Sequence, residues 1–203
     1  MRFLRSGRPS LDLAWTVRFR NVWPTELLVD TGALHDWLQE TYSNVVFEDS
    51  LDFSELLERI RPLREALYGL VMATTRGDSW LEDDLLLVND AARGPRFVHA
   101  LDLMTTRPVR AATAEQVLAE LAVDAIDVLN ADRTRLKNCQ GPLCALPFLD
   151  ESRGATRRWC ATQRCGNRVN TKAYRDRSRR EKQSGSDAGS SERTGPVSPT
   201  TAS

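Results

Sequence analysis

The sequence has few histidines and cysteines, no glycine-rich phosphate loop and no long apolar run. Of its 203 residues, 2 are histidine and 4 are cysteine. No stretch approaches the roughly 18 apolar residues of a membrane-spanning helix, and the first residues lack the apolar segment of a signal peptide. We therefore expect a cytoplasmic protein whose cysteines stay reduced. Without a phosphate loop or a clear acid and base pair, we expect no enzymatic activity and no catalytic residue.

Acidic and basic residues are equal in number, 28 of each, but their distribution along the chain is uneven. Residues 1–132 hold 13 basic and 22 acidic side chains, a net charge of −9, whereas residues 133–182 hold 14 basic and 4 acidic ones, a net charge of +10. Residues 183–203 are mostly small or polar, which predicts a disordered tail because they cannot bury enough apolar surface to fold. We therefore predict an acidic body, a basic segment with an anionic partner, and a tail.

The body is predicted to be mainly helical. Apolar residues recur every three or four positions in most of it, and we expect helices in five segments: Ser10–Val17, Thr31–Glu40, Asp52–Arg76, Ser79–Ala92 and Thr113–Asn130. Ser10 is the expected N-cap of the first helix, and Thr113 with Gln116 matches a capping box. Pro62 predicts either a kink or the first turn of a second helix. Partial alternation predicts a small β-hairpin between residues 97 and 108.

All four cysteines lie within 27 residues, in the pattern Cys139-x4-Cys144-x15-Cys160-x4-Cys165. Two close pairs joined by a short loop can present four thiolates to one tetrahedral Zn²⁺. Two disulfides are the alternative, but the missing secretory signal favours a metal. Because four cysteines would fill the coordination sphere, we predict one structural zinc rather than a hydrolytic one. Four thiolates would also accept iron.

Basic side chains crowd the same segment and favour a nucleic-acid partner. We expect a helix over residues 165–182, where positions 168, 172, 175 and 179 share one face. Guanidinium groups bind phosphate and guanine through two hydrogen bonds, although a solvated charged face is the alternative. Charge alone does not separate DNA from RNA or an acidic protein. The candidate DNA contacts are Arg157, Arg158, Arg168, Lys172, Arg175 and Arg179.

Two parts of the sequence resemble known families. The run Cys165–Arg168, preceded by Phe148–Ser152 and Arg157–Cys160, resembles the CGNR zinc finger. Three pieces of the body are similar to the ABATE domain, which accompanies that finger in bacterial proteins: Leu11–Ala14, Leu34–Leu38 and Pro62–Ala66. The resemblance implies a stress-responsive, DNA-binding transcription regulator with Cys139, Cys144, Cys160 and Cys165 as zinc ligands. It also implies that the body binds an unidentified small molecule.

The body offers tryptophans and histidines that could line a ligand pocket, namely Trp15, Trp23, Trp37, Trp80, His35 and His99. A core position is the favoured interpretation for such aromatic residues, so the ligand-binding residues stay unknown. We predict an ABATE-like sensing domain at 1–132, a CGNR-type finger at 133–182 and a tail at 183–203. A homodimer or a partner factor is expected on duplex DNA, because one finger binds weakly. The alternatives are an adaptor that binds an acidic protein or RNA, and an enzymatic body.

Overall fold

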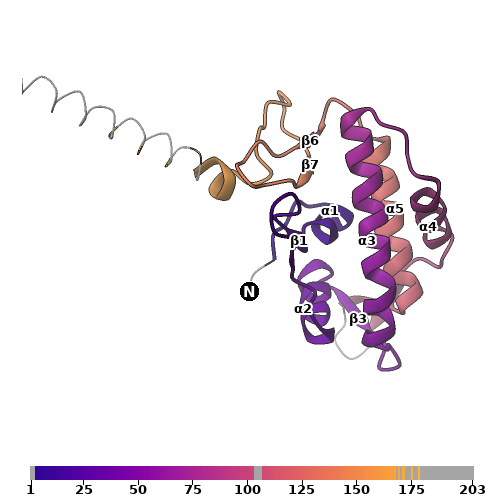
Figure 1. The fold of residues 1–203 in the computed structure, drawn as a ribbon. Coiled ribbons are helices and arrows are strands. Elements are labelled where there is room, and N and C mark those ends of the chain that lie inside the picture. The colour runs from indigo at the N-terminus through magenta and orange to yellow at the C-terminus, as the bar shows by residue number, and fades with distance from the viewer. Residues whose placement is uncertain are drawn as a thin grey trace, which may run out of the picture.

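The computed structural model describes residues 3–102 and 107–167, together with Val169, Thr171, Arg175 and Ser178. The predicted mainly helical class is confirmed. In Figure 1 the two long helices α3 and α5 run side by side, α4 packs on both, and α1 also contacts both. The helices are α1 (Pro9–Ala14), α2 (Thr31–Thr41), α3 (Phe53–Arg76), α4 (Glu82–Ala92) and α5 (Ala114–Asn130).

Three small sheets accompany the helices. Their strands are β1 (Val17–Arg18), β2 (Thr25–Glu26), β3 (Val45–Phe47), β4 (Val98–Asp102), β5 (Arg107–Ala112), β6 (Leu136–Asn138) and β7 (Pro147–Leu149). β4 pairs antiparallel with β5, which confirms the predicted hairpin, although β5 continues to Ala112. β3 joins the other edge of β5 in parallel, and no local pattern predicted that pairing. β1 pairs antiparallel with β2, and β6 with β7.

Capping side chains explain where three of the helices begin. Asp30 Oδ1 accepts a hydrogen bond from the backbone nitrogen of Ala33 at 2.8 Å, which fixes the start of α2. Asp52 caps α3 in the same way. The predicted capping box of α5 is confirmed, since Thr113 and Gln116 each accept from the other's backbone nitrogen.

The predicted cap of the first helix is wrong. α1 begins one residue earlier, at Pro9, whose fixed φ suits the first helical position. The backbone nitrogen and hydroxyl of Ser10 instead donate to Asp124 Oδ2 on α5, at 2.9 and 2.5 Å. The helix also ends at Ala14, short of the predicted Val17, because Val17 pairs with Glu26 in a strand.

Pro62 does not divide α3, which runs without a break over 24 residues. The helix ends where Gly77 adopts a φ of +76°, a left-handed conformation that glycine reaches without steric cost. α4 begins three residues later than predicted, because Leu81 is still extended.

The apolar core of the body lies between α2, α3, α4 and α5. Trp37 is completely buried there, as the core interpretation predicted. That interpretation is wrong for Trp23 and Trp80, which are 57% and 42% exposed. Within the described part of the chain, no helix combines the length and the apolar character that crossing a membrane requires.

A buried carboxyl group ties α1 to the N-terminal segment. Asp12 is 2% exposed and accepts hydrogen bonds from the backbone and hydroxyl of Ser6. Arg5 forms an ion pair with it at 3.2 Å. Burial raises the pKa of Asp12 to about 6, and the contacts with Ser6 and Arg5 only partly oppose this effect. The folded protein therefore retains the Asp12 proton at pH values where an unfolded chain releases it.

This shift predicts that the Asp12 contribution to stability decreases as the pH rises from about 4 to about 6. A shift of roughly two pKa units corresponds to about 3 kcal/mol. Asp12→Asn imitates the protonated form and should gain about that much relative to wild type between pH 4 and pH 7. Urea unfolding of both proteins across this pH range measures the difference in their free energy of unfolding. Any effect of pH on the cysteines is the same in both proteins and cancels in that difference. A difference in free energy of unfolding between the two proteins that does not change with pH would contradict the prediction.

Candidate metal centre

The finger is built on the β6–β7 ladder and a one-turn π-helix, η1 (Thr162–Gly166). Cys139 and Cys144 lie in the turn between the two strands, where Cys144 N donates to Gly141 O at 3.0 Å. Cys165 lies in η1 and its backbone nitrogen donates to Ala161 O at 2.9 Å. A Cβ at Gly141 would lie only 3.0 Å from Cys165 Sγ, so the close approach of the two halves requires glycine.

The four cysteine sulfur atoms form one compact cluster, with all of them within 4.8 Å of one another. Cys160 Sγ lies 3.7 Å from Cys144 Sγ and 3.8 Å from Cys165 Sγ. A tetrahedral zinc with Zn–S bonds of about 2.3 Å separates its ligands by about 3.8 Å, so the cluster has the dimensions of a metal site. None of the four is in a disulfide, and these separations are far longer than a bonded S–S distance.

Hydrogen bonds among the four thiols lower the pKa of some of them and raise the pKa of others. Hydrogen bonds from Cys144, Cys160 and Cys165 lower the pKa of Cys139. The resulting thiolate in turn raises the pKa of Cys144 and of Cys160. A divalent cation at the centre of the cluster would remove this conflict, because it stabilises all four thiolates together.

A buried carboxylate shapes the loop between the two cysteine pairs. Asp150 is fully buried and accepts from Lys137 Nζ, from the Ser152 hydroxyl and from the Arg157 backbone nitrogen, at 2.8, 2.6 and 2.8 Å. Burial alone would favour its neutral form, but these donors lower the pKa of Asp150 well below its usual value. These hydrogen bonds hold the loop that leads from the first cysteine pair to Cys160 around the buried carboxylate.

The predicted DNA contacts differ in their surroundings. Arg157 is half-buried, with Nη2 donating to Cys160 O at 2.9 Å and the guanidinium 5.2 Å from the Phe148 ring centroid. The sequence did not predict that Arg157 would hold the loop that carries Cys160. Arg158 and Arg175 are exposed, while Arg168, Lys172 and Arg179 lie outside the described residues, as does the predicted tail. DNA contact stays a prediction for all six.

Hydrogen bonds between described residues dock the finger on the body. Trp15 Nε1, at the C-terminal end of α1, donates to Pro147 O at 2.7 Å. From α3, the Tyr68 hydroxyl donates to Ala145 O at 3.3 Å, and Thr75 Oγ1 accepts from Asn138 Nδ2 at 2.8 Å. Residues 132–138 contain no flexible linker of Gly, Ser or Pro, which predicts a finger docked on the last helix. Val128 of α5 does contribute through an apolar cluster with Leu136. The polar contacts, however, come from α1 and α3.

An apolar cluster shared by body and finger covers the cysteines. Ala14 of α1 and Trp15, which directly follows that helix, pack with Leu146 and Phe148 of the finger and with all four cysteines. Trp15 is 2% exposed. Because the body supplies one side of this cluster, the environment of the metal site depends on α1 as well as on the finger.

The aromatic and histidine residues considered for a ligand pocket do not gather in one place. Trp15 lies against the finger and Trp37 in the core, whereas His35 is exposed on α2. His99 lies in β4, and its side chain is outside the described part of the structure. A groove of about 470 Å³ lies elsewhere, between α3, α4 and α5, and sequence reasoning missed it. Its lining includes Pro62, Leu63, Leu87 and Leu118, with Glu58, Arg59 and Glu115 among its polar residues.

A helical body with a docked four-cysteine finger defines the class as a zinc-finger protein. The CGNR zinc finger model matches residues 135–178. Residues 7–132 match the ABATE family, described as "Putative stress-induced transcription regulator". This match covers more than half of the chain, so the protein belongs to the ABATE family. No curated protein matches it.

Proposed function

We propose that the chain is a zinc-dependent transcription regulator that binds duplex DNA through its finger. In this proposal it acts as a homodimer in the cytoplasm and nucleoid, and it is not an enzyme. The observation that carries this proposal is the position of the four-thiol cluster within the most basic part of the chain. Residues 133–182 have a net charge of +10, which four thiolates and one Zn²⁺ reduce to about +8. Such a segment attracts the phosphate backbone of DNA.

Zinc would have a structural role in this proposal. Cys139, Cys144, Cys160 and Cys165 would hold it, and a sphere closed by four thiolates has no position for a reacting water. The residues of the chain do the rest. Asp150 and Arg157 fix the ligand loops, and exposed arginines such as Arg158 and Arg175 bind phosphate.

The groove between α3, α4 and α5 supports a sensing role for the body. α3 contributes Glu58, Pro62 and Leu63 to the groove, and Tyr68 and Thr75 to the finger contact. One uninterrupted helix thus reaches both places. A small apolar ligand in the groove would change the position of α3 and, through it, the orientation of the finger.

Salt dependence tests the DNA-binding proposal. If five phosphates are contacted, log K should decrease with log salt concentration with a slope of about −4.5. Arg158→Ala should reduce the magnitude of the slope by about 1, whereas the matched change Arg93→Ala, at an exposed arginine of the body, should leave it unchanged. Fluorescence anisotropy with a labelled duplex gives both values. A slope of zero, or equal competition by heparin and duplex, would favour the adaptor that binds an acidic protein or RNA.

A further inference from the structure

We propose that the β1–β2 loop is a second DNA-contacting element, in which Val22 and Trp23 press an apolar wedge against the duplex beside the finger. This inference rests on the DNA-binding function proposed above and assigns part of that contact to the body. The ligand chemistry is that of sugar and base surfaces, as opposed to the phosphates contacted by arginine.

The loop exposes large apolar side chains next to the finger. Val22 and Trp23 are 47% and 57% exposed, and Leu143 of the first cysteine turn is 46% exposed. Phe19 connects them, since its ring centroid lies 6.0 Å from that of Trp23 and it lines a hollow together with Leu143. We call these four residues the apolar patch. Single exposed apolar residues are common, but a patch that extends over two separate elements indicates a binding surface.

The backbone adopts unfavourable conformations at two positions of the apolar patch. Phe19 has a φ of +55° and Leu143 a φ of +66°. Within the described parts of the chain, Ala155 is the only other non-glycine residue with positive φ. Glycine would accept these conformations freely, whereas bulky side chains there are strained. Strain of this kind is concentrated at functional sites, and here it positions exposed apolar groups.

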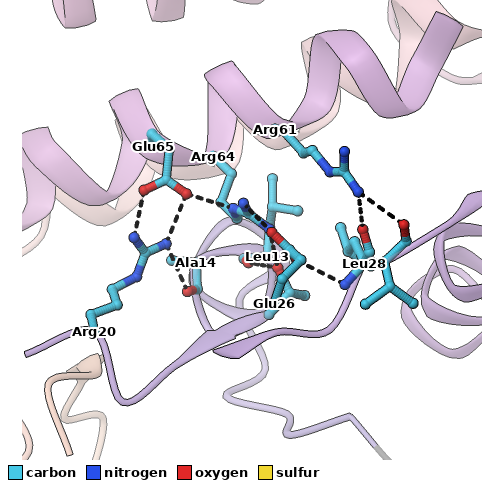
Figure 2. Close-up of polar contacts among 10 residues, drawn as sticks. Leu13, Ala14, Arg20, Glu26, Leu28, Arg61, Arg64 and Glu65 are labelled. Carbon is cyan, nitrogen blue, oxygen red and sulfur yellow. Dashed lines mark hydrogen bonds and ion pairs between the residues drawn. The ribbon is translucent and has the colours of Figure 1, made fainter. Parts of the chain in front are cut away.

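An arginine network connects the base of the loop to α3, as Figure 2 shows. Arg64 is buried and donates to both carboxylate oxygens of Glu26 in β2, at 2.8 and 2.7 Å. Arg20 pairs with Glu65, and its guanidinium lies 4.0 Å from the ring centroid of Tyr68. The turn itself is closed by bonds from the nitrogens of Val22 and Trp23 to Phe19 O. A loop that is already ordered loses little entropy when it binds.

The adjoining charges favour DNA over an apolar protein partner. Arg164 of η1 lines the same hollow as Phe19 and Leu143 and directly precedes Cys165. The apolar patch therefore adjoins the basic segment. DNA-binding proteins combine basic side chains on phosphates with apolar wedges between or against base steps, and the apolar patch together with Arg164 supplies both components.

The test compares Trp23→Ala with Trp80→Ala in the full-length, zinc-loaded protein. Trp80 is a matched control because it is also partly exposed but lies just before α4, where its Nε1 donates to Thr74. We expect Trp23→Ala to weaken binding to a short duplex by about 10-fold or more, as the loss of one base-stacking residue does. The salt slope should not change, because an apolar contact releases no counterions. Trp80→Ala should stay within about 2-fold of wild type.

A second variant, Val22→Ser, and a binding signal from the native tryptophan complete the test. Val22→Ser should weaken duplex binding in the same direction, and both variants should retain the zinc content and melting temperature of wild type. Duplex addition should change tryptophan fluorescence more in wild type than in Trp23→Ala, where the remaining change would come from Trp159 beside Arg158. If Trp23→Ala binds the duplex as Trp80→Ala does, the wedge is overturned while DNA binding by the finger stands. If wild type binds no duplex, the proposed function itself fails.

Discussion

Cys165→Ser is expected to weaken zinc binding about 100-fold and to destabilise the finger. A structural zinc contributes on the order of 10–16 kcal/mol, and with four equal ligands the loss of one thiolate costs about 3 kcal/mol, a factor of about 100 in affinity. The remaining apolar groups are too few to keep the finger folded, because its strands are only 3 residues each. Since Cys165 packs in one cluster with Trp15, the edge of the body should also loosen.

Metal analysis of the purified proteins and their thermal unfolding measure this effect. Wild type should contain one zinc per chain and lose it to a strong chelator together with its finger structure. The control is Gln140→Ser, which introduces serine at an exposed position of the first cysteine turn without removing a thiolate. It should bind zinc as wild type does. A Cys165→Ser protein that binds zinc with the affinity of wild type would exclude Cys165 as a ligand. Iron in the wild-type protein would replace zinc in the proposal and leave the ligand assignment intact.

Trp15→Ala is expected to release the finger from the body as well as to destabilise the protein. Removing a buried tryptophan side chain costs about 3–5 kcal/mol. Here the indole is 2% exposed, donates to Pro147 O and packs beside the cysteines. The substitution therefore opens a cavity at the body–finger contact and exposes the metal site to solvent. Zinc should leave for a chelator about 10-fold faster or more, because local opening becomes easier.

Trp37→Ala separates this effect from general destabilisation. Trp37 is equally buried but lies in the main core of the body, and it makes no part of the cluster around the cysteines. Both variants should lose a similar free energy of unfolding in urea. Only Trp15→Ala should accelerate zinc release under conditions where each protein is still folded. Equal release rates in the two variants would show that the contact with α1 does not protect the metal.

Local signals in the sequence were sufficient for most helices and for the cysteine cluster. The capping box of Thr113 and Gln116 and the apolar spacing of α3 involve residues within one or two turns of each other. The spacing of the four cysteines likewise encodes two tight turns. Such patterns depend on neighbouring residues, so they can be recognised before the fold is known.

Features that depend on distant residues were missed. Serine is a residue type that often caps a helix, but the backbone N–H and the hydroxyl of Ser10 both donate to Asp124 of α5. The parallel pairing of β3 with β5 joins segments that are separated by two helices. Trp15 and Trp23 are the same residue type in neighbouring parts of the chain, yet one is buried and the other exposed. Their different surroundings are set by whether the finger covers them, which no local pattern contains.

The packing of α1 against the finger restricts how the two segments can evolve. The change of composition near residue 132 looks like a border between independent modules, but the apolar cluster of Trp15, Leu146 and Phe148 crosses that border. A finger excised from the gene would carry half of a core, and the remaining body would expose the other half. We therefore expect recombination to separate these two segments rarely, and each to accumulate mutations that are compensated in the other.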